Sequence, residues 1–366
     1  MSCLLFSTKP AYSQTSKPSE MTHEQLVAQA KKDAIYRAPI LNKAGKPVDE
    51  KEAEMIATSD QHMADAEAAR LRGDFETAAR LADQALQVRL KILDGKNHRI
   101  VTANGLKTTA ESRTTLSKEK REAVHQADLK MADAKRFYDG GQYEESRVAA
   151  TEALTIYEQN LKEGDIDIAA ALFGIGTADV DLGLFDEADL NLTRSLSIYQ
   201  TAYGNAHPIL GKVEDRLGWM CVLQAVGENF QGDKARNALQ HFNNAIRVIA
   251  RSSGENQELA ESLDNRGTIQ YYLGNTDEAL RDKIRALVIR ETILGPDARD
   301  TGVSYSNLGW LYSQLGRREL VIPFRTKALD ILKKNLDADH PFCLMETSNL
   351  ARPCTPGQAG RGHQAL

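Results

Sequence analysis

The sequence has few of the residues that mark several classes of protein. Aromatic residues make up only 6% of the chain, and there are 10 prolines among 366 residues. No apolar run approaches the roughly 18 residues that a transmembrane helix needs. The net charge is −5 and there is no basic stripe, which argues against nucleic acid as the main partner. Alanine, leucine and glutamate are abundant instead. Because these residues favour helices, the composition predicts an all-α fold.

Metal-site spacing is also missing. The four cysteines are Cys3, Cys221, Cys343 and Cys354. They are too far apart in sequence to form a CxxC pair, and no histidine stands at ligand spacing beside them. His207 and His340 each precede a proline, and a proline is well placed in the first turn of a helix, where its missing N–H costs nothing. We therefore expect free thiols, no bound metal and no cofactor.

Motifs of the common enzyme classes are absent too. The sequence contains no GxxxxGK[ST], no GxSxG and no HExxH. The stretch GIGTAD at 174–179 has two glycines, but no predicted strand precedes it, so it is not a dinucleotide site. The many acidic residues scatter over helix exteriors. We therefore expect no intrinsic catalysis.

What the chain does contain is an internal repeat. Six similar stretches start at Gly73, Gly141, Gly183, Gly232, Gly274 and Gly316. In five of the six stretches a small residue such as Ala78 recurs seven positions later, as at Ala85, and is followed by aliphatic residues; in the sixth, Val321 takes the first of these positions. Small residues seven apart share one helix face and let another helix approach closely. Each copy is therefore expected to be a helix that packs against its neighbours.

A second helix is predicted before each turn. Gly176, Gly267 and Gly309 each stand seven residues before a turn glycine, inside a helical pattern. A glycine there costs about 1 kcal/mol relative to alanine. Its recurrence predicts a partner helix that crosses with no room for a Cβ atom, whereas the turn glycine itself ends the helix. In the first two copies Ala66 and Ala134 replace the inner glycine.

The repeats recur about every 42 residues, with two insertions. The first covers roughly residues 99–124 and is predicted to be one additional helix followed by a basic linker, SKEKRE. The second lies in the turn at 226–233. Two helices per copy, with glycines seven apart and an alanine-leucine pair in the second helix, resemble the tetratricopeptide repeat. The period resembles the long-helix variant of kinesin light chains, and the resemblance covers about residues 58–351.

The resemblance implies a right-handed α-solenoid of about six repeats plus a seventh first helix. In that family the first helices line a concave face that binds an extended or helical peptide. The matching positions here are Asn265, Asn307, Asn349, Trp219, Trp310, Tyr271 and Arg216. An amide there both donates and accepts hydrogen bonds, and an exposed ring can anchor a partner. Arg216 with Lys212 would add a positive patch. The alternative is that these side chains pack on, or hydrogen-bond to, the next repeat.

The two ends lie outside the repeat. Residues 1–20 contain AYSQ, which resembles the end of a secretory signal, so the sequence leaves open a cytoplasmic or an exported (periplasmic or secreted) protein. Residues 21–57 are predicted to be a helix with Thr22 as N-cap and a loop, which together cap the stack or form an interaction arm. Residues 352–366 are predicted to be disordered. Read one base later, their degenerate codons allow a further repeat, which suggests a frameshifted tail.

Three functions follow from this reading. The leading hypothesis is a non-catalytic scaffold that binds a protein or peptide segment on its concave face. The alternative is a regulatory or sensor array cut from a larger enzyme or signalling protein. The third is a solenoid that associates with itself. Fold does not fix the partner, and the sequence does not predict the oligomeric state.

Overall fold

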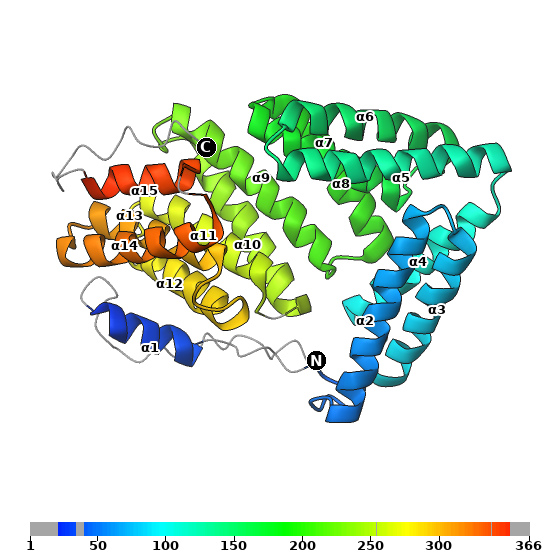
Figure 1. Ribbon diagram of the computed structural model, residues 1–366, viewed down its shortest axis with the longest axis horizontal. Coiled ribbons are helices and arrows are strands. Elements are labelled where there is room, and N and C mark those ends of the chain that lie inside the picture. Colours follow the sequence, from blue (N-terminus) through cyan, green and yellow to red (C-terminus); the bar gives the residue numbers. More distant parts are fainter. Residues whose placement is uncertain (1–20, 34–39, 254, 338, 352–366) are drawn as a thin grey trace, which may run out of the picture. The chain divides into compact units, whose positions relative to one another are not determined.

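The computed structural model describes residues 21–33, 40–253, 255–337 and 339–351. The leader at 1–20 and the tail at 352–366 lie outside the described residues, so the predictions made for them stay predictions. The described residues form fifteen helices and no strand beyond a single bridge between Leu41 and Pro47 (Figure 1). The chain divides into two compact units. Unit 1 contains residues 1–34 and 274–366, and unit 2 contains residues 35–273.

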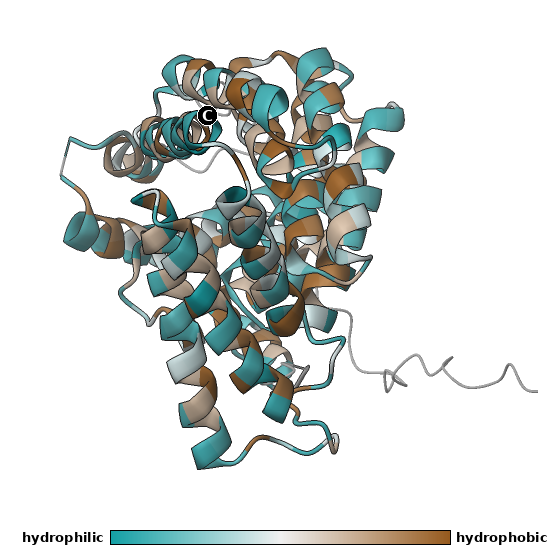
Figure 2. Ribbon diagram, turned by 90° about the vertical axis from the view of Figure 1, so that its right-hand side faces the viewer, coloured by the Kyte–Doolittle hydropathy of each residue, from teal (hydrophilic) through white to brown (hydrophobic). Residues whose placement is uncertain are grey.

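Unit 2 holds the first four helix pairs, the extra helix and the first helix of the fifth pair. Its helices are α2 (Glu50–Leu71), α3 (Phe75–Ile92), α4 (His98–Thr114), α5 (Lys118–Asp139), α6 (Tyr143–Asn160), α7 (Ile166–Leu182), α8 (Phe185–Tyr203), α9 (Pro208–Gly227), α10 (Asp233–Ser253) and α11 (Gln257–Tyr272). In the four complete pairs the first helix packs on the second helix of its own repeat, as α5 does on α6 and α9 on α10. Figure 2 shows hydrophobic residues gathered on the sides of helices that face other helices.

Unit 1 holds the remaining repeats. Its helices are α1 (His23–Asp33), α12 (Thr276–Ile293), α13 (Arg299–Gln314), α14 (Arg318–Asn335) and α15 (Pro341–Ala351). Here α13 packs on α14, and α14 packs on α15, which is the predicted seventh first helix. Unit 1 therefore continues the same alternation of first and second helices.

The turn glycines behave as predicted. Gly73, Gly141, Gly183, Gly274 and Gly316 all have φ between 71° and 83°. This left-handed conformation strains residues that have a Cβ atom, so glycine favours the end of the first helix there. The longer turn after α9 uses Asn229 and Phe230 in the left-handed region instead, with φ of 47° and 59°. The ring of Phe230 stacks on Tyr272 at 3.8 Å between centroids, and this contact holds the strained turn.

The inner glycines have the predicted packing reason. A Cβ atom on Gly176 would lie 2.8 Å from Leu192 of α8, and one on Gly218 would lie 2.8 Å from Phe242 of α10. Real Cβ atoms do not approach that closely. The second helix of the same repeat therefore crosses the first helix at this point, as the repeated cost of glycine indicated.

The insertion at 99–124 is partly as predicted. The additional helix exists as α4, which packs along α3 so that α2, α3 and α4 lie side by side (Figure 1). The prediction of a basic linker is wrong. SKEKRE forms the start of α5, because Ser117 accepts a hydrogen bond from the Lys120 N–H as N-cap and Glu119 adds a favourable charge in the first turn. The charges are thus part of a helix end.

The segment at 21–57 does not act as one cap. Thr22 does cap α1, since its Oγ1 accepts from the Gln25 N–H at 3.3 Å. However, α1 groups with unit 1 and packs against α12. The following loop belongs to unit 2, where Asp49 and Glu52 form a capping box that starts α2. The sequence pattern showed the helix but not the surface on which it lies.

Candidate binding face

The first helices of unit 2 form a layer of their own. α2 contacts α5, α5 contacts α7, α7 contacts α9, and α9 contacts α11. Four of the predicted binding residues lie on the last two of these helices: Arg216 and Trp219 on α9, and Tyr271 and Asn265 on α11. Because α9 and α11 are neighbours, the structure brings these four residues onto one part of unit 2.

Asn265 bridges two repeats. Its Nδ2 donates to Asp215 Oδ2 of α9 at 3.2 Å, so the alternative of hydrogen bonding between repeats is realised. Burial, assisted by the nearby Glu261 charge, raises the pKa of Asp215 to about 7. Its second oxygen, Oδ1, is buried and accepts no hydrogen bond from the described residues. Sequence reasoning missed Asp215, although a carboxyl group one position before Arg216 is visible in the repeat alignment.

Arg216 is held within the layer. Its guanidinium pairs with Asp181 of α7 and donates to the hydroxyl of Tyr138 on α5, whose ring centroid lies 5.7 Å away. The Arg216 side chain is only 16% exposed. Arg216 thus joins three successive first helices, and its charge is already balanced. The other predicted cation, Lys212, pairs with Glu258 at 3.0 Å. Neither residue presents an unpaired positive charge.

The two aromatic residues of this group are half-buried. Trp219 packs against the apolar cluster formed by α7–α10, which is the packing alternative, and part of its ring remains accessible. The ring of Tyr271 meets that of Tyr272 edge to face, with 5.3 Å between centroids. Burial raises the pKa of the Tyr271 hydroxyl, which therefore stays protonated and able to donate at neutral pH. Both aromatic residues thus pack against neighbouring side chains and are still partly accessible to solvent.

The other three predicted residues lie in unit 1. Asn307 and Trp310 are on α13, and both are half-buried. The Nζ atom of Lys283, whose side chain is almost completely buried, lies 5.9 Å from the centroid of the Trp310 ring. Asn349 on α15 donates to Glu346 Oε1 at 3.3 Å within the same helix. These residues form a second group, described separately from that of unit 2.

Asn349 belongs to a buried ionic cluster that sequence reasoning missed. Glu346 is 0% exposed and pairs with Arg325 of α14 at 3.3 Å. Ser306 of α13 donates to the same carboxylate at 2.6 Å. The available signal was Arg325 itself, because the equivalent position is apolar in the first four repeats, as at Leu192, and charged only here and at Lys283. The cluster joins α13, α14 and α15 and fixes the position of the last helix.

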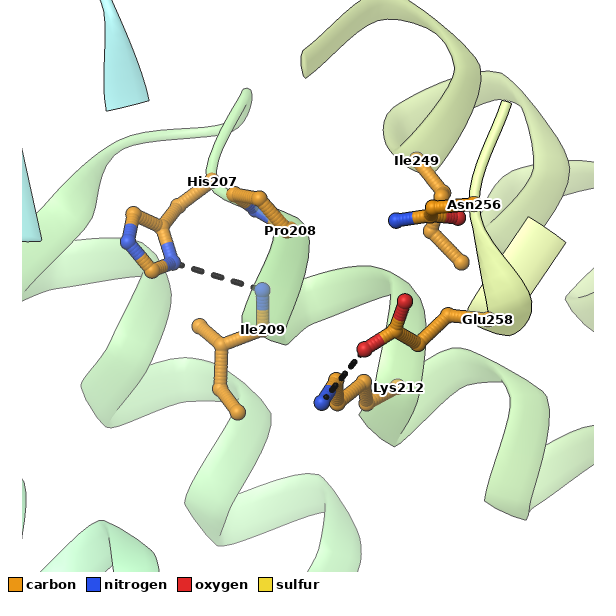
Figure 3. A pocket seen from close by; sticks show the side chains of 7 residues that line it. All are labelled: His207, Pro208, Ile209, Lys212, Ile249, Asn256 and Glu258. Atoms are coloured by element: carbon orange, nitrogen blue, oxygen red, sulfur yellow. Dashed lines mark hydrogen bonds and ion pairs between the residues drawn. The ribbon is translucent and has the colours of Figure 1, made fainter. Parts of the chain in front are cut away.

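A cavity of about 220 Å³ opens beside the start of α9 in unit 2 (Figure 3). Its lining consists of His207, Pro208, Ile209, Lys212, Ile249, Asn256 and Glu258. The Lys212–Glu258 ion pair crosses it, as the dashed line in Figure 3 shows. The imidazole of His207 points away from the cavity in this view, towards the backbone N–H of Ile209, which donates to Nδ1 at 3.3 Å. His207 therefore serves as the N-cap of α9.

The extra helix α4 completes the environment of His207. Thr102 Oγ1 lies 2.8 Å from His207 Nε2 and donates to the carbonyl of His98 at 2.9 Å. The ring of Tyr203 stacks on His207 with 4.3 Å between centroids. Since Nδ1 accepts from Ile209, the neutral Nε2–H tautomer satisfies all these contacts. A second proton, on Nδ1, would turn that atom into a donor that faces the N–H donor of Ile209 at the start of α9.

Acid is therefore expected to weaken unit 2 through His207. Burial, together with His98, lowers the pKa of His207 to about 4, against about 6.5 for an unfolded histidine. The unfolded chain then takes up the proton first, so this contribution to stability is complete above pH 6.5 and is lost as the pH falls towards 4. Between pH 7 and 4.5 the free energy of unfolding should fall by about 2 kcal/mol more in the wild type than in His207→Asn. Asparagine keeps an N-cap acceptor without a titrating group. Equal losses in the two proteins, measured by urea unfolding, would contradict this role.

The chain is thus an α-solenoid of helix pairs whose first helices carry the candidate residues. Residues 272–334 match the family model of the tetratricopeptide repeat. The chain is 25% identical over 241 residues to Protein KINESIN LIGHT CHAIN-RELATED 3 of Arabidopsis thaliana, an alignment that covers 65% of this chain. The chain thus contains tetratricopeptide repeats, and its repeats are similar to those of a kinesin light chain-related protein. The chain spans only 35% of the length of that relative.

Two solved structures share the fold. A Rap protein complexed with competence and sporulation factor is 12% identical with a TM-score of 0.53, covering 82% of this chain and 80% of that one. Aspartyl phosphate phosphatase F from Bacillus subtilis is 13% identical with a TM-score of 0.51, covering 87% of this chain and 83% of that one. At these identities the likeness concerns the fold alone. None of the described helices combines the length and the apolar character that a membrane span requires.

Proposed function

We propose that this chain is a scaffold that binds a segment of a protein partner along its first helices. The observation that carries the proposal is the group on α9 and α11. There the Asn265 amide, held by the Asp215 carboxyl group, and two half-buried rings lie on adjacent first helices. Such a set offers hydrogen-bonding groups for a peptide backbone and apolar area for side chains.

The chemistry of the group favours a peptide over a charged small molecule. Arg216 and Lys212 are both paired with carboxylates, so no excess positive charge attracts an anion. Asp215 accepts a hydrogen bond from Asn265 Nδ2 and so orients that amide. In unit 1, Asn307 and Trp310 provide an equivalent amide and ring on α13. The Rap protein similar in fold was solved with a bound factor, which agrees with a binding role for this fold.

The experiment is a quantitative capture assay from source lysate with the full chain. The variant Asn265→Ala/Asn307→Ala/Trp310→Ala is expected to lose at least about tenfold of the specifically bound partner, because a central aromatic anchor alone is worth roughly 2 kcal/mol or more. The matched control is Leu190→Ala/Ile322→Ala, which removes two side chains that are 69% and 59% exposed on second helices. Melting curves check that both variants fold.

Two outcomes would refute the proposal. If every partner survives the triple substitution in a folded protein, the first-helix residues do not bind. If the control loses the partner and the triple variant keeps it, binding lies on the second helices instead. Loss in the triple variant alone supports the proposal, and the captured protein is then confirmed by direct titration with the purified chain.

A further inference from the structure

Unit 1 shows that this fold holds a helix that is not part of a repeat. α1 packs against α12 and buries Leu26, which is 4% exposed. The ring of His23 lies 4.6 Å from that of Phe324 on α14 and 6.1 Å from that of Tyr312 on α13. Its Nδ1 atom is 3.0 Å from the Tyr312 hydroxyl oxygen. One repeat thus binds a helix outside the repeats, because the His23 ring of that helix packs between the first helix and the second helix of the repeat.

The same positions in the second repeat line an open cavity. The alignment that places Gly141 opposite Gly316 also places Phe137 opposite Tyr312 and Ala149 opposite Phe324. In unit 2 these positions border a cavity of about 370 Å³ between α5 and α6. Its lining consists of Lys130, Asp133, Phe137, Glu144, Glu145, Val148, Ala149 and Glu152. No described helix fills it in the way that α1 fills the seat in unit 1.

The substitutions between the two repeats explain the open space. Where unit 1 has the large ring of Phe324, unit 2 has the methyl group of Ala149, which leaves room for a side chain from outside. Val148, which lines the cavity, is 48% exposed and adds accessible apolar area. Phe137 is half-buried and is covered on one side by Arg136, whose guanidinium lies 5.2 Å from the ring centroid. The floor of the cavity is therefore apolar and accessible.

The rim of the cavity is acidic. Lys130 pairs with Glu152, and Arg136 pairs with Asp133 at 3.0 Å, so these charges cancel. Glu144 and Glu145 in the first turn of α6 have no ion pair among the described residues. Two carboxylates beside an apolar floor favour an occupant that carries both an apolar side chain and positive charge.

We propose that the α5–α6 cavity is a docking site for a basic amphipathic helix of a protein partner. An apolar side chain of that helix enters between Phe137 and Ala149, and Lys or Arg residues on its flank pair with Glu144 and Glu145. In unit 1 the preceding helix α12 completes the seat, whereas in unit 2 the α5–α6 pair alone lines it, so the partner contacts mainly these two helices. The site uses different repeat positions from the first-helix residues of the proposed function. Either site can therefore fail without the other.

The test uses the full chain and two fluorescent synthetic peptides of 18 residues. Both carry one stripe of Leu with a central Phe, and their flanks carry either Lys or Glu. Anisotropy at physiological salt is expected to show the Lys peptide binding at least about tenfold more tightly than the Glu peptide. Ala149→Phe, whose ring takes up the space that a partner side chain would enter, should weaken the Lys peptide by at least about tenfold. Glu144→Lys/Glu145→Lys should do the same.

Matched controls separate the cavity from general attraction to an acidic protein. Ala132→Phe adds a ring at an exposed position of α5, and Glu54→Lys reverses an exposed charge on α2. Both should leave the affinity within about twofold. A benzophenone in place of the central Phe should cross-link to α5 or α6. The proposal is overturned if Ala149→Phe binds like the wild type or if cross-links fall elsewhere. A wild-type dimer that Ala149→Phe converts to a monomer in sedimentation would assign the cavity to a second copy instead.

Discussion

Replacing Arg70 with alanine is expected to lower the free energy of unfolding by about 3–5 kcal/mol. Arg70 on α2 donates to Asp128 Oδ1 of α5 at 2.6 Å, and the Asp128 side chain is only 1% exposed. Tyr157 of α6 donates to the same oxygen, also at 2.6 Å. Without Arg70, a buried carboxylate keeps a hydroxyl partner but loses its cation. A buried charge left without its counter-ion is among the most costly changes a single substitution can make.

The loss should depend on pH in a defined direction. Burial raises the pKa of Asp128 to about 6, although Arg70 opposes that shift. Because the folded pKa lies above the unfolded one, the cost of burying this charge is present at neutral pH and fades as the pH falls through the folded value. Removing Arg70 raises the pKa of Asp128 further. The deficit of Arg70→Ala relative to the wild type should therefore shrink between pH 7 and pH 5.

Urea unfolding of three variants decides whether the charge is the cause. Arg80→Ala removes an exposed arginine from α3 and should change the free energy of unfolding by less than about 0.5 kcal/mol. Arg70→Ala/Asp128→Asn removes both charges of this pair and should recover part of the loss, since the carboxylate that Arg70 neutralised is then absent. If the double variant is as unstable as Arg70→Ala at every pH, packing of the arginine stem rather than charge explains the effect.

The repeat architecture could be predicted because it depends on local rules. Glycine at a left-handed position and small residues seven apart are visible without any long-range information, as at Gly183 and Ala188. The seat of α1 could not be predicted in this way. An eleven-residue amphipathic helix shows that it needs an apolar surface, but nothing in its own sequence selects α12 over the first repeat. That choice depends on contacts such as His23 with Phe324.

The candidate site was predictable only as a set of positions. The alignment placed Asn265 and Arg216 on first helices, and the structure agrees. It did not show that each has a partner on a neighbouring helix. Asp215 comes next to Asn265, and Asp181 next to Arg216, only when the repeats stack. The same limit explains the missed cluster at Glu346. Its partner Arg325 lies on a different helix, and the pairing needs the crossing geometry of α14 and α15.

The crossing of first and second helices also follows a size rule across the repeats. Where the inner residue is glycine, the residue opposite it is large: Gly176 faces Leu192, Gly218 faces Phe242 and Gly309 faces Arg325. Where the inner residue is alanine, the residue opposite is alanine too: Ala66 packs with Ala82, and Ala134 packs with Ala150. Repeats that lack the methyl group of alanine on the first helix thus carry a larger side chain at the opposite position of the second helix. Glycine on the first helix goes with the larger partner on the second helix in the five crossings described.

The size rule predicts a strong coupling between Gly176 and Leu192. Gly176→Ala alone should destabilise the protein by about 1–3 kcal/mol, because its Cβ atom would lie 2.8 Å from Leu192. Leu192→Ala alone should cost about 2–5 kcal/mol, since the leucine is completely buried. The double variant recreates the alanine pair of the first two repeats. In that background the new methyl group enters the space left by leucine, and alanine is also the better helix former by about 1 kcal/mol.

The effect of Gly176→Ala on the free energy of unfolding should therefore change sign, from destabilising in the wild type to stabilising in Leu192→Ala. Urea unfolding of the four proteins measures the coupling, which should exceed about 1 kcal/mol. Gly227→Ala provides the matched control, because a Cβ atom at the end of α9 would meet nothing within 4 Å. Its effect should add to that of Leu192→Ala without coupling. Additive effects at Gly176 as well would show that the helices shift apart to admit the methyl group, and the crossing would then not be the rigid contact that selects glycine.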